Sequence, residues 1–536
     1  MCGTKKAIPL LSFVLLVLFS NLAKADLSPA TISKHFKELR DTPDLHLDCT
    51  AEDQIGQGSA GLVYKCLDTE TNESVAVKAM PWECKYNDNI LRLCIEQIKE
   101  IGVLTRAVGS QYLLQLVRTP IFKETNVYLV LEYHPESLFR LFNVFTVPNF
   151  PGQWPTMNLK TSIGNLVMGL KELYKMGVAY LDLNPRNILL RKSNRNFVLA
   201  DFGSATADLS AVLDVTQNHH CKECEAFIPT DRYAFYTTRL WRAPELFASE
   251  TFYGRAADYW SLGIVIYNIL TQGGFPFQGD TDIETFSQIQ GLFGTLLNPK
   301  EFTFPNLTIY ESDQNTKNGF AQGPEQTITL IKALLQLDPQ KRQRDADPLL
   351  NALVADPAIH PKNRALKEVP MVWRQKRTEN DRKNKAQVMQ RIYDVWTDKK
   401  WSLPTYFAAN EILEHYLDTQ EKIDENALLL NGLGALNLAA TLYEGKLISI
   451  NSKLVHYDNH RINEVSISMV QALWNKDYVT FPNPFSPLTL LTKKCLAGEI
   501  THATFDAAVQ KLGDRTFDFP TATTGAELVD QILAAK

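Results

Sequence analysis

The sequence predicts an α+β fold that is followed by an all-α region. Three observations support this prediction. The chain has 536 residues, which is too many for one hydrophobic core, so we expect two or three domains. In residues 49–133, strand patterns lie on both sides of one helical pattern. Beyond residue 386, the apolar residues follow a helical spacing and strand signals are few.

The composition is that of a folded soluble protein, with 45% apolar and 21% charged residues. The net charge of -5 gives no reason to expect a nucleic-acid partner. No internal repeat or low-complexity segment is apparent. An enzyme and a protein-binding module therefore remain as the classes to distinguish.

The N-terminus is typical of an export signal. Lys5 and Lys6 precede an apolar run, Ala7–Phe19, and Ala23-Lys24-Ala25 offers a small-x-small cleavage site. The run is short for a membrane span, and no later segment looks membrane-spanning. We therefore expect residues 1–25 to be a cleaved signal peptide and 26–48 to be an N-terminal extension. An uncleaved anchor or an N-terminal core helix is the alternative.

The cysteines are sparse and odd in number, which argues against a scaffold built on disulfides. Cleavage after Ala25 leaves seven of them, Cys49, Cys66, Cys84, Cys94, Cys221, Cys224 and Cys495. Two N-glycosylation sequons, Asn72-Glu73-Ser74 and Asn306-Leu307-Thr308, matter only if the chain passes through a eukaryotic secretory route.

A glycine-rich segment, Ile55–Lys65 (IGQGSAGLVYK), follows the pattern G-x-G-x-x-G-x-V. Apolar strand-forming residues flank the glycines and no βαβ pattern follows. The segment therefore favours a hairpin folded over phosphates and not a dinucleotide site. Small residues allow the backbone to approach phosphate oxygens closely. The candidate nucleotide-binding residues here are Ile55, Gly56, Gly58, Gly61 and Val63.

A lysine on the next strand is the candidate partner of these phosphates. Val75-Ala76-Val77-Lys78 places Lys78 on an alternating strand, 17 residues after Gly61, where a point charge can hold the phosphates. That charge needs a carboxylate, and Glu96 and Glu100 lie one turn apart on the helical pattern Ile90–Val108. We choose Glu100, because this choice places Val103 and Leu104 on the buried face. A solvated helix carboxylate is the alternative.

Further motifs follow in order, and together they identify a family. Val178–Leu190 reads VAYLDLNPRNILL, and it is followed by Asp201-Phe202-Gly203, Ala243-Pro244-Glu245, Asp258–Gly263 (DYWSLG) and Arg342. With the glycine-rich segment and Lys78, these are seven motifs in the right order, which cannot reasonably be accidental. The sequence resembles a eukaryotic-type protein kinase.

The resemblance implies transfer of the γ-phosphoryl group of ATP with Mg²⁺ as cofactor. In it Asp182 accepts the proton of the attacking hydroxyl, and Asn187 and Asp201 bind Mg²⁺. Glu245 would form a structural ion pair with Arg342. The strand ending at Glu132 would be the hinge that meets adenine. The implied nucleotide-binding residues are Ile55, Gly56, Gly58, Gly61, Val63, Ala76, Lys78 and Glu132.

Two residues depart from the family pattern. Leu181 replaces the arginine that clasps a phosphate on the activation segment, so activity should not depend on that phosphorylation through this contact. Asn184 replaces the lysine that steadies the γ-phosphate, and this loss could lower the rate. Arg186 stands where tyrosine kinases carry a compensating arginine. We expect a working enzyme, because the groups that touch metal or the transferred proton are present. A non-catalytic scaffold is the alternative.

Within the family, Tyr236–Glu245 (YTTRLWRAPE) resembles the cyclin-dependent and mitogen-activated kinase branch. Leu337–Arg342 fits its Asp-Pro-x-Lys-Arg end, and Gln97–Ile101 resembles the helix on which cyclins dock. Thr238 matches a threonine that binds the catalytic aspartate in Ser/Thr kinases, so we expect Ser/Thr acceptors. His219–Cys224 (HHCKEC) could bind zinc, form a local disulfide or remain an unligated loop.

The C-terminal third contains helical patterns after a charged stretch, Arg374–Lys385, that reads as a linker or a solvated helix. Their order resembles a cyclin box, with Ala440–Glu444 (ATLYE) at the end of the buried central helix. The hallmark lysine is Leu442 here, and its glutamate partner is Ser466, so both halves of that ion pair are missing. A generic helical bundle is the alternative.

The sequence thus predicts a kinase N-lobe over 49–133, a C-lobe over 134–362, a charged linker over 363–385 and a helical cyclin-like domain over 386–536. We expect protein substrates and support in cis from the cyclin-like domain. ATP is scarce outside cells, so an exported kinase must work in an ATP-supplied lumen or, as a microbial effector, in a host cytoplasm.

Overall fold

The computed structural model describes residues 46–50, 54–58, 61–81, 88–118, 121–122, 126–145, 159–191, 196–207, 237–247, 254–270, 273–294, 324–355, 359, 379–399, 401, 403–420, 425–443, 459–474, 490–491, 494, 499–513 and 525–534. The expected signal peptide, the hexapeptide His219–Cys224 and the sequon at Asn306 lie outside them. The chain forms two compact units, Met1–Cys94 with Pro120–Val130 and Ile95–Thr119 with Leu131–Lys536.

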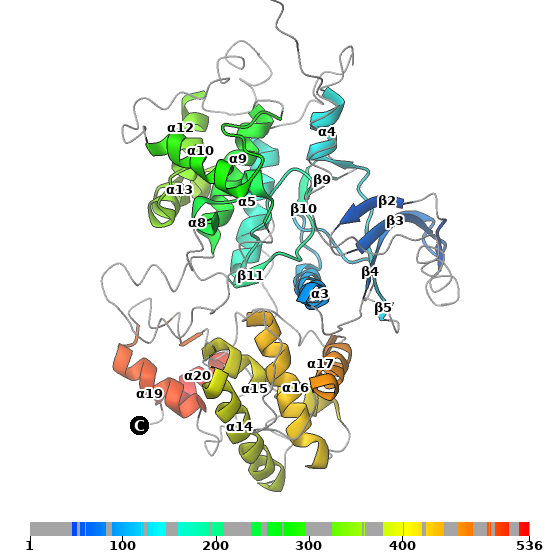
Figure 1. Cartoon of the computed structure of the whole chain (residues 1–536), viewed down its shortest axis with the longest axis vertical. Helices are drawn as coiled ribbons and strands as arrows, with labels where there is room; N and C mark the ends of the chain where they lie inside the picture. Colours follow the sequence, from blue (N-terminus) through cyan, green and yellow to red (C-terminus); the bar gives the residue numbers. More distant parts are fainter. Residues whose placement is uncertain are drawn as a thin grey trace, which may run out of the picture. The chain divides into compact units, whose positions relative to one another are not determined.

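The first unit is built on an antiparallel sheet. Its strands are β1 (Leu47–Asp48), β2 (Gln54–Gly58), β3 (Gly61–Asp68), β4 (Glu73–Pro81), β5 (Ile121–Phe122) and β6 (Asn126–Glu132). The order is β1-β3-β4-β6-β5. Strand β2 pairs with β3, and both are labelled in Figure 1. Side chains of β3 alternate between buried and exposed, as a sheet with one covered face requires. The core cluster is Leu62, Tyr64, Cys66, Val75, Val77, Ala79, Tyr128 and Val130.

A turn between β3 and β4 carries the first sequon. The Asp68 carboxylate accepts the backbone N–H groups of Glu70 (3.0 Å) and Thr71 (3.3 Å), which is the local bonding that favours aspartate in turns. Asn72 follows with φ of 58° and is exposed. Asparagine tolerates this left-handed conformation better than most residues.

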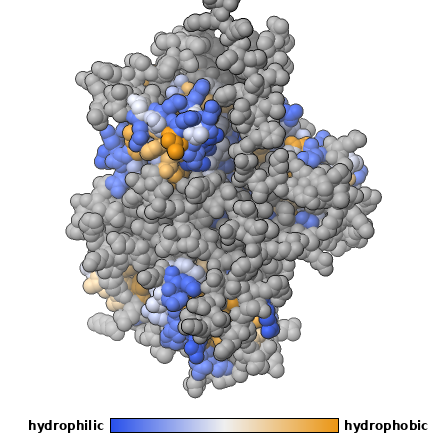
Figure 2. Space-filling model, in the orientation of Figure 1, coloured by the Kyte–Doolittle hydropathy of each residue, from blue (hydrophilic) through white to orange (hydrophobic). Residues whose placement is uncertain are grey.

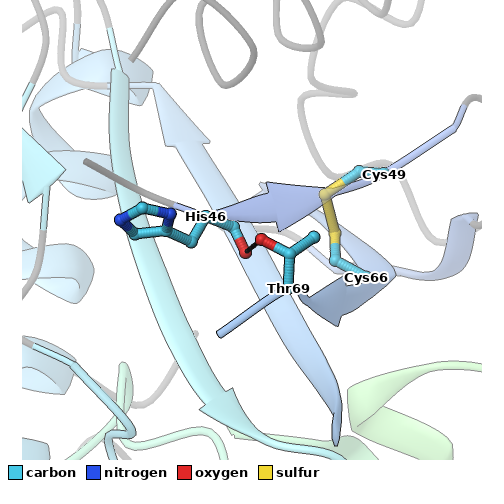
Figure 3. The surroundings of a disulfide bond; sticks show 4 residues. All are labelled: His46, Cys49, Cys66 and Thr69. Atoms are coloured by element: carbon cyan, nitrogen blue, oxygen red, sulfur yellow. Dashed lines mark hydrogen bonds between the residues drawn. A yellow bond between two sulfur atoms is a disulfide. The ribbon is translucent and has the colours of Figure 1, made fainter. Parts of the chain in front are cut away.

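A disulfide between Cys49 and Cys66 ties the start of the sheet to β3 (Figure 3). The register pairs Asp48 with Leu67, so the two cysteine Cα atoms lie 4.6 Å apart, within the range that a disulfide bridges. At the other end of the strand pair, the carbonyl of His46 accepts the N–H (2.7 Å) and the hydroxyl (2.9 Å) of Thr69. The sheet edge is therefore held by one covalent bond and a local hydrogen-bonded closure.

The second unit contains a mixed region and a helical region. The elements of the mixed region are α3 (Asp88–Ala107, which begins in the first unit), β7 (Glu136–Ser137), α4 (Leu138–Phe145), α5 (Leu159–Lys175), β8 (Val178–Ala179), β9 (Ile188–Leu190), β10 (Phe197–Leu199), β11 (Thr206–Ala207), α8 (Pro244–Phe247), α9 (Arg255–Leu270), α10 (Asp282–Gly294), α12 (Pro324–Leu334) and α13 (Pro339–Val354). Helix α9 is buried along almost its whole length and packs against α12 and α13. This burial explains why its sequence is apolar on every side.

A buried ion pair joins α8 to α13, which confirms the pairing expected from the sequence. The guanidinium of Arg342 donates to both carboxylate oxygens of Glu245, at 2.7 and 3.1 Å. It also donates to the carbonyls of Gln336 (2.8 Å) and Ala256 (2.8 Å), and it lies over the ring of Trp260. A buried pair is stable only when its remaining donors are satisfied, and these carbonyls satisfy them.

The helical region consists of α14 (Glu379–Lys399), α15 (Leu403–Thr419), α16 (Glu425–Tyr443), α17 (Asn459–Trp474), α19 (His502–Gly513) and α20 (Gly525–Ala534). Helix α16 packs against α14, α15 and α17. A Cβ on Gly432 would lie 2.5 Å from Val388, and one on Gly434 would lie 2.7 Å from Val465. Glycine at these two positions therefore allows α14 and α17 to approach α16 closely.

The charged stretch before this region is helical at its end. Helix α14 begins at Glu379, and Lys385 forms an ion pair with Glu414, a buried carboxylate of α15. Residues 379–385 thus belong to the helical region. Among the described helices, none combines the length and apolarity needed to span a bilayer. On the face in Figure 2, the described side chains are mostly hydrophilic, with small apolar groups between them.

Removing the disulfide should destabilise the first unit. We predict that Cys49→Ala lowers its free energy of unfolding by about 3 kcal/mol. The bond joins residues 17 positions apart, and closing a loop of about 15 residues in the unfolded chain contributes about this much. Cys49 is only partly buried, so this change leaves a smaller cavity than a change at Cys66. Urea unfolding followed by tryptophan fluorescence and circular dichroism measures the loss. Reductant should lower the free energy of unfolding of the wild type by the same amount and leave that of Cys49→Ala unchanged. Identical unfolding curves for the fully reduced and the oxidised wild type would contradict the prediction.

Candidate active site

The glycine-rich hairpin in the first unit has the predicted form. Strands β2 and β3 pair with Gly58 opposite Gly61. Gly61 has φ of 153°, and a Cβ there would lie 2.1 Å from the carbonyl oxygen of Ala79 on β4. The close approach of β4 is therefore enough to require glycine at position 61. The sequence analysis explained this glycine by the approach of phosphate oxygens instead. A Cβ on Gly56 would make only ordinary contact, at 3.6 Å from Val63.

The other nucleotide-binding candidates of this unit flank the hairpin. Lys78 lies on β4 opposite Val63 and is buried, as is Ala76. Ile55 on β2 is 49% exposed. Glu100, the expected partner of Lys78, lies on α3 in the second unit with a side chain that is also buried. The ion pair between Lys78 and Glu100 stays a prediction.

In the second unit, the proposed proton acceptor is held by three donors. The Oδ1 atom of Asp182 accepts the hydroxyl (2.6 Å) and the backbone N–H (3.0 Å) of Thr238. Its Oδ2 atom accepts the side-chain amide of Asn187 at 2.9 Å. The structure therefore brings together three residues that the sequence analysis chose, from a loop and from a segment more than 50 residues later.

Burial raises the pKa of Asp182 to about 6. The hydrogen bonds from Thr238 and Asn187 act in the opposite direction, and the negative charge of Asp201 adds to the increase. A carboxylate with this pKa is a stronger base than an exposed aspartate and is still mostly ionised at neutral pH. Both properties suit a group that accepts a proton during catalysis.

The backbone before Asp182 is fixed by Asp258, a fully buried residue of α9. Its carboxylate accepts the N–H groups of Tyr180 (2.9 Å) and Leu181 (2.6 Å) and the hydroxyl of Tyr174 (3.1 Å). Leu181 has φ of 65°, and its side chain is buried. A buried leucine offers no charge to a phosphate, and the expectation that activity does not depend on phosphorylation through this contact stays a prediction.

The metal candidates lie beside this loop. The N–H of Ala200 donates to the carbonyl of Asn187 (2.9 Å), so Asp201 follows directly after a residue bonded to the loop. Tyr180 donates its hydroxyl to the carbonyl of Ala200 and contacts Phe202 edge-on. The amide nitrogen of Asn187 is used by Asp182, and the described residues donate no hydrogen bond to its oxygen. A carboxylate and an amide oxygen are hard ligands that fit Mg²⁺.

The sequence assigns to Asn184 only the loss of a cation, whereas in the structure its side chain makes three hydrogen bonds. Its side chain is buried and donates to the carbonyl of Asp182 (3.0 Å) and the hydroxyl of Thr238 (3.2 Å). The oxygen of its amide accepts the N–H of Arg186 at 3.0 Å. Arg186 is exposed as a residue, and its guanidinium lies 4.6 Å from the ring centre of Phe139.

The segment that carries Thr238 is held by Arg242. Its guanidinium donates to the hydroxyl and the carbonyl of Thr237, both at 2.8 Å, and forms an ion pair with Asp282 at 2.8 Å. Arg242 is buried, so its bonds to Thr237 are protected from water, whereas Asp282 is half-exposed. The position of Thr238 beside Asp182 is thereby fixed from both sides.

The hinge candidate Glu132 lies in a cluster with His134 and Arg191. His134 Nε2 lies 3.2 Å from the Glu132 carboxylate, and Arg191 lies 3.4 Å from it and donates to the carbonyl of Gln111. Burial by itself raises the pKa of Glu132, but the hydrogen bond from His134 and the charge of Arg191 outweigh it and lower the pKa. The cluster connects the hinge to the end of β9.

Comparison with known proteins gives two findings. The family described as Protein kinase domain matches residues 49–352, which is more than half of the chain. Cyclin-dependent kinase B2-1 of Arabidopsis thaliana is 25% identical over 305 residues, covering 54% of this chain and 88% of the relative. The matched range includes the hairpin, Lys78, the loop of Asp182 and the buried pair of Glu245 and Arg342. It ends before the helical region, which begins at α14.

Proposed function

We propose that this chain, which belongs to the protein kinase family, transfers the γ-phosphoryl group of ATP to serine or threonine hydroxyls of protein substrates. Its α+β kinase fold is followed by a helical region, as expected from the sequence. The observation that carries the proposal is the position of Asp182, whose two oxygens bind Thr238 and Asn187. An intact loop of this form supports a working enzyme over a non-catalytic scaffold.

The residues divide the work as follows. Asp182 orients the acceptor hydroxyl and takes its proton. Asn187 and Asp201 would hold Mg²⁺, which would neutralise the charge of the phosphoryl group that ATP supplies. Asp258 fixes the loop, and Arg242 fixes the segment of Thr238. The hydrogen bond between Thr238 and Asp182 supports the choice of Ser/Thr acceptors.

Replacement of the base should abolish transfer. We predict that Asp182→Asn lowers kcat by roughly 10²- to 10⁴-fold while Mg-ATP still binds, because the amide cannot accept the proton. Transfer of labelled phosphate to a generic protein substrate measures kcat, and calorimetry measures binding. Asp345→Asn, an exposed aspartate on α13, is the matched control and should behave as wild type. Equal transfer by wild type and Asp182→Asn contradicts the proposal and favours a scaffold.

Activity should also fall in acid. Asp182 accepts a proton only when it is ionised, so we predict that kcat/KM drops tenfold per pH unit below about 6 and is level above it. A profile whose acid limb lies near pH 4, the ordinary range of aspartate, contradicts this assignment.

We further propose that the helical region is cyclin-like and supports the kinase in cis. The central position of α16 between α14, α15 and α17 favours this over an unrelated bundle. Ser466, where the resemblance expects a glutamate, accepts a hydrogen bond from the side-chain amide of Asn437 (3.0 Å), and its hydroxyl lies 2.9 Å from the carbonyls of both Gly434 and Ile462, to one of which it donates. A neutral, satisfied contact thus replaces the missing ion pair. A tethered activator acts at high effective concentration, so no separate partner is required.

Loss of the helical region should lower activity. We predict that deletion of residues 380–536 reduces kcat, because Glu100 on α3 loses the support that a cyclin gives in the family. Adding the separate helical region back at high concentration should restore part of the rate. Full activity of a truncated kinase with an unchanged melting temperature contradicts cis support.

We propose that the protein is exported, either to an ATP-supplied lumen or as an effector into another cell. The N-terminal pattern supports this, and so does the disulfide of Cys49 and Cys66, since disulfides persist in oxidising compartments. Mass spectrometry of the protein purified from its source should find a mature N-terminus at Asp26 and the two cysteines linked. A chain that retains Met1 and carries both thiols reduced contradicts export.

A further inference from the structure

We propose that Asn184 is a positioning residue for Asp182, which it directs through the hydroxyl of Thr238. This inference rests on the proposed function. The sequence alone assigns to Asn184 only the absence of a cation. In the structure its side chain is 2% exposed, and the amide nitrogen donates to the carbonyl of Asp182 and to the hydroxyl of Thr238.

The hydrogen bonds determine where the single hydroxyl proton of Thr238 lies. A threonine hydroxyl has one proton and two lone pairs. The amide nitrogen of Asn184 is a donor only, so Thr238 Oγ1 must be the acceptor at 3.2 Å. The hydroxyl proton is then available for Asp182 Oδ1, which lies 2.6 Å away. Asn184 therefore removes one of the two directions in which Thr238 is able to donate.

The same bonds distinguish the two oxygens of Asp182. Oδ1 receives two donors from Thr238, its hydroxyl and its N–H. Oδ2 receives one donor, the amide of Asn187. A carboxylate oxygen accepts about two hydrogen bonds, so Oδ2 is the atom with capacity for another donor. The substrate hydroxyl is therefore bound at Oδ2.

The transfer step balances with this assignment. The substrate oxygen forms a bond to the γ-phosphorus of ATP as its O–H bond breaks, and the proton passes to Asp182 Oδ2. The bond between the γ-phosphorus and the bridging oxygen breaks, and its electron pair remains on ADP. The proton on Asp182 then leaves to solvent. Asn184 takes no part in these bonds and acts only through Thr238.

The oxygen of the Asn184 side-chain amide explains why a neutral residue fits this buried position. The oxygen of Asn184 accepts the N–H of Arg186, and its own carbonyl accepts the N–H of Asn187. An ammonium has three donors and no acceptor, so it would leave the N–H of Arg186 without this partner. Asparagine supplies a donor to Thr238 and an acceptor to the turn at the same time.

The test compares Asn184→Ala with Asn184→Lys and with the wild type. We expect Asn184→Ala to lower kcat by roughly ten- to a hundredfold with KM for ATP within about twofold, because the base loses its orientation. The acid limb of kcat/KM should move above pH 6, since weaker bonds from Thr238 no longer lower the pKa of Asp182. Asn351→Ala, an exposed asparagine on α13, is the matched control and should leave kcat and the profile unchanged.

Asn184→Lys separates a positioning role from a packing role. Its ammonium restores a donor toward Thr238 and places a cation near Asp182. We therefore expect kcat to recover above that of Asn184→Ala with the KM for ATP unchanged, because a contact of the lysine with the γ-phosphate would lower the KM for ATP as well. If the position served packing only, the long charged side chain would be more damaging than alanine. A kcat of Asn184→Lys below that of Asn184→Ala overturns the inference.

The outcomes for this inference and for the proposed function are distinct. An active wild type whose kcat and pH profile are unchanged in Asn184→Ala overturns the positioning role and leaves the kinase assignment intact. A wild type that binds Mg-ATP and transfers no phosphate overturns the proposed function, and the inference with it.

Discussion

A buried carboxylate that binds the backbone of the catalytic loop is the constraint on which the rest of the site depends. Leu181 adopts a left-handed conformation, which costs a non-glycine residue about 1–3 kcal/mol. Asp258 accepts the N–H groups of Tyr180 and Leu181, and a hydrogen bond to a charged group contributes about 1.5–3 kcal/mol. Two such bonds outweigh the strain. The turn that these two bonds hold orients Asp182 toward Thr238. The contacts of Asp182 with Thr238 and Asn187 depend on that orientation.

The chain carries neutral residues at three places where its resemblance to kinases, and in the helical region to a cyclin box, leads one to expect charge. Leu181 is buried in place of an arginine, Asn184 is hydrogen-bonded in place of a lysine, and Ser466 is hydrogen-bonded in place of a glutamate. Burying a charge is expensive unless it is paired. At the two hydrogen-bonded positions the neutral side chains have neutral partners, the hydroxyl of Thr238 and the amide of Asn437.

Much of the site could be predicted because its signals are local or strongly patterned. The glycine-rich hairpin, the contact of Thr238 with Asp182 and the pair of Glu245 with Arg342 were expected and are present. The partner of Cys49 could not be predicted, because it depends on the register of β1 against β3. The role of Asn184 depends on a segment more than 50 residues away, and no spacing in the sequence reveals it. The pairing of Lys78 with Glu100 stays a prediction, since the two side chains lie in separate compact units.

Burial of Asp182 makes it a base with a raised pKa, and the proposed reaction depends on this property. Carbon-13 NMR of the aspartate carboxyl carbons measures that pKa, with the Asp182 signal assigned by its absence from an asparagine variant. We expect this carbon to titrate with a midpoint near pH 6. A midpoint near 3.8, the ordinary value for aspartate, would show that the carboxylate is solvated and would contradict this role of Asp182.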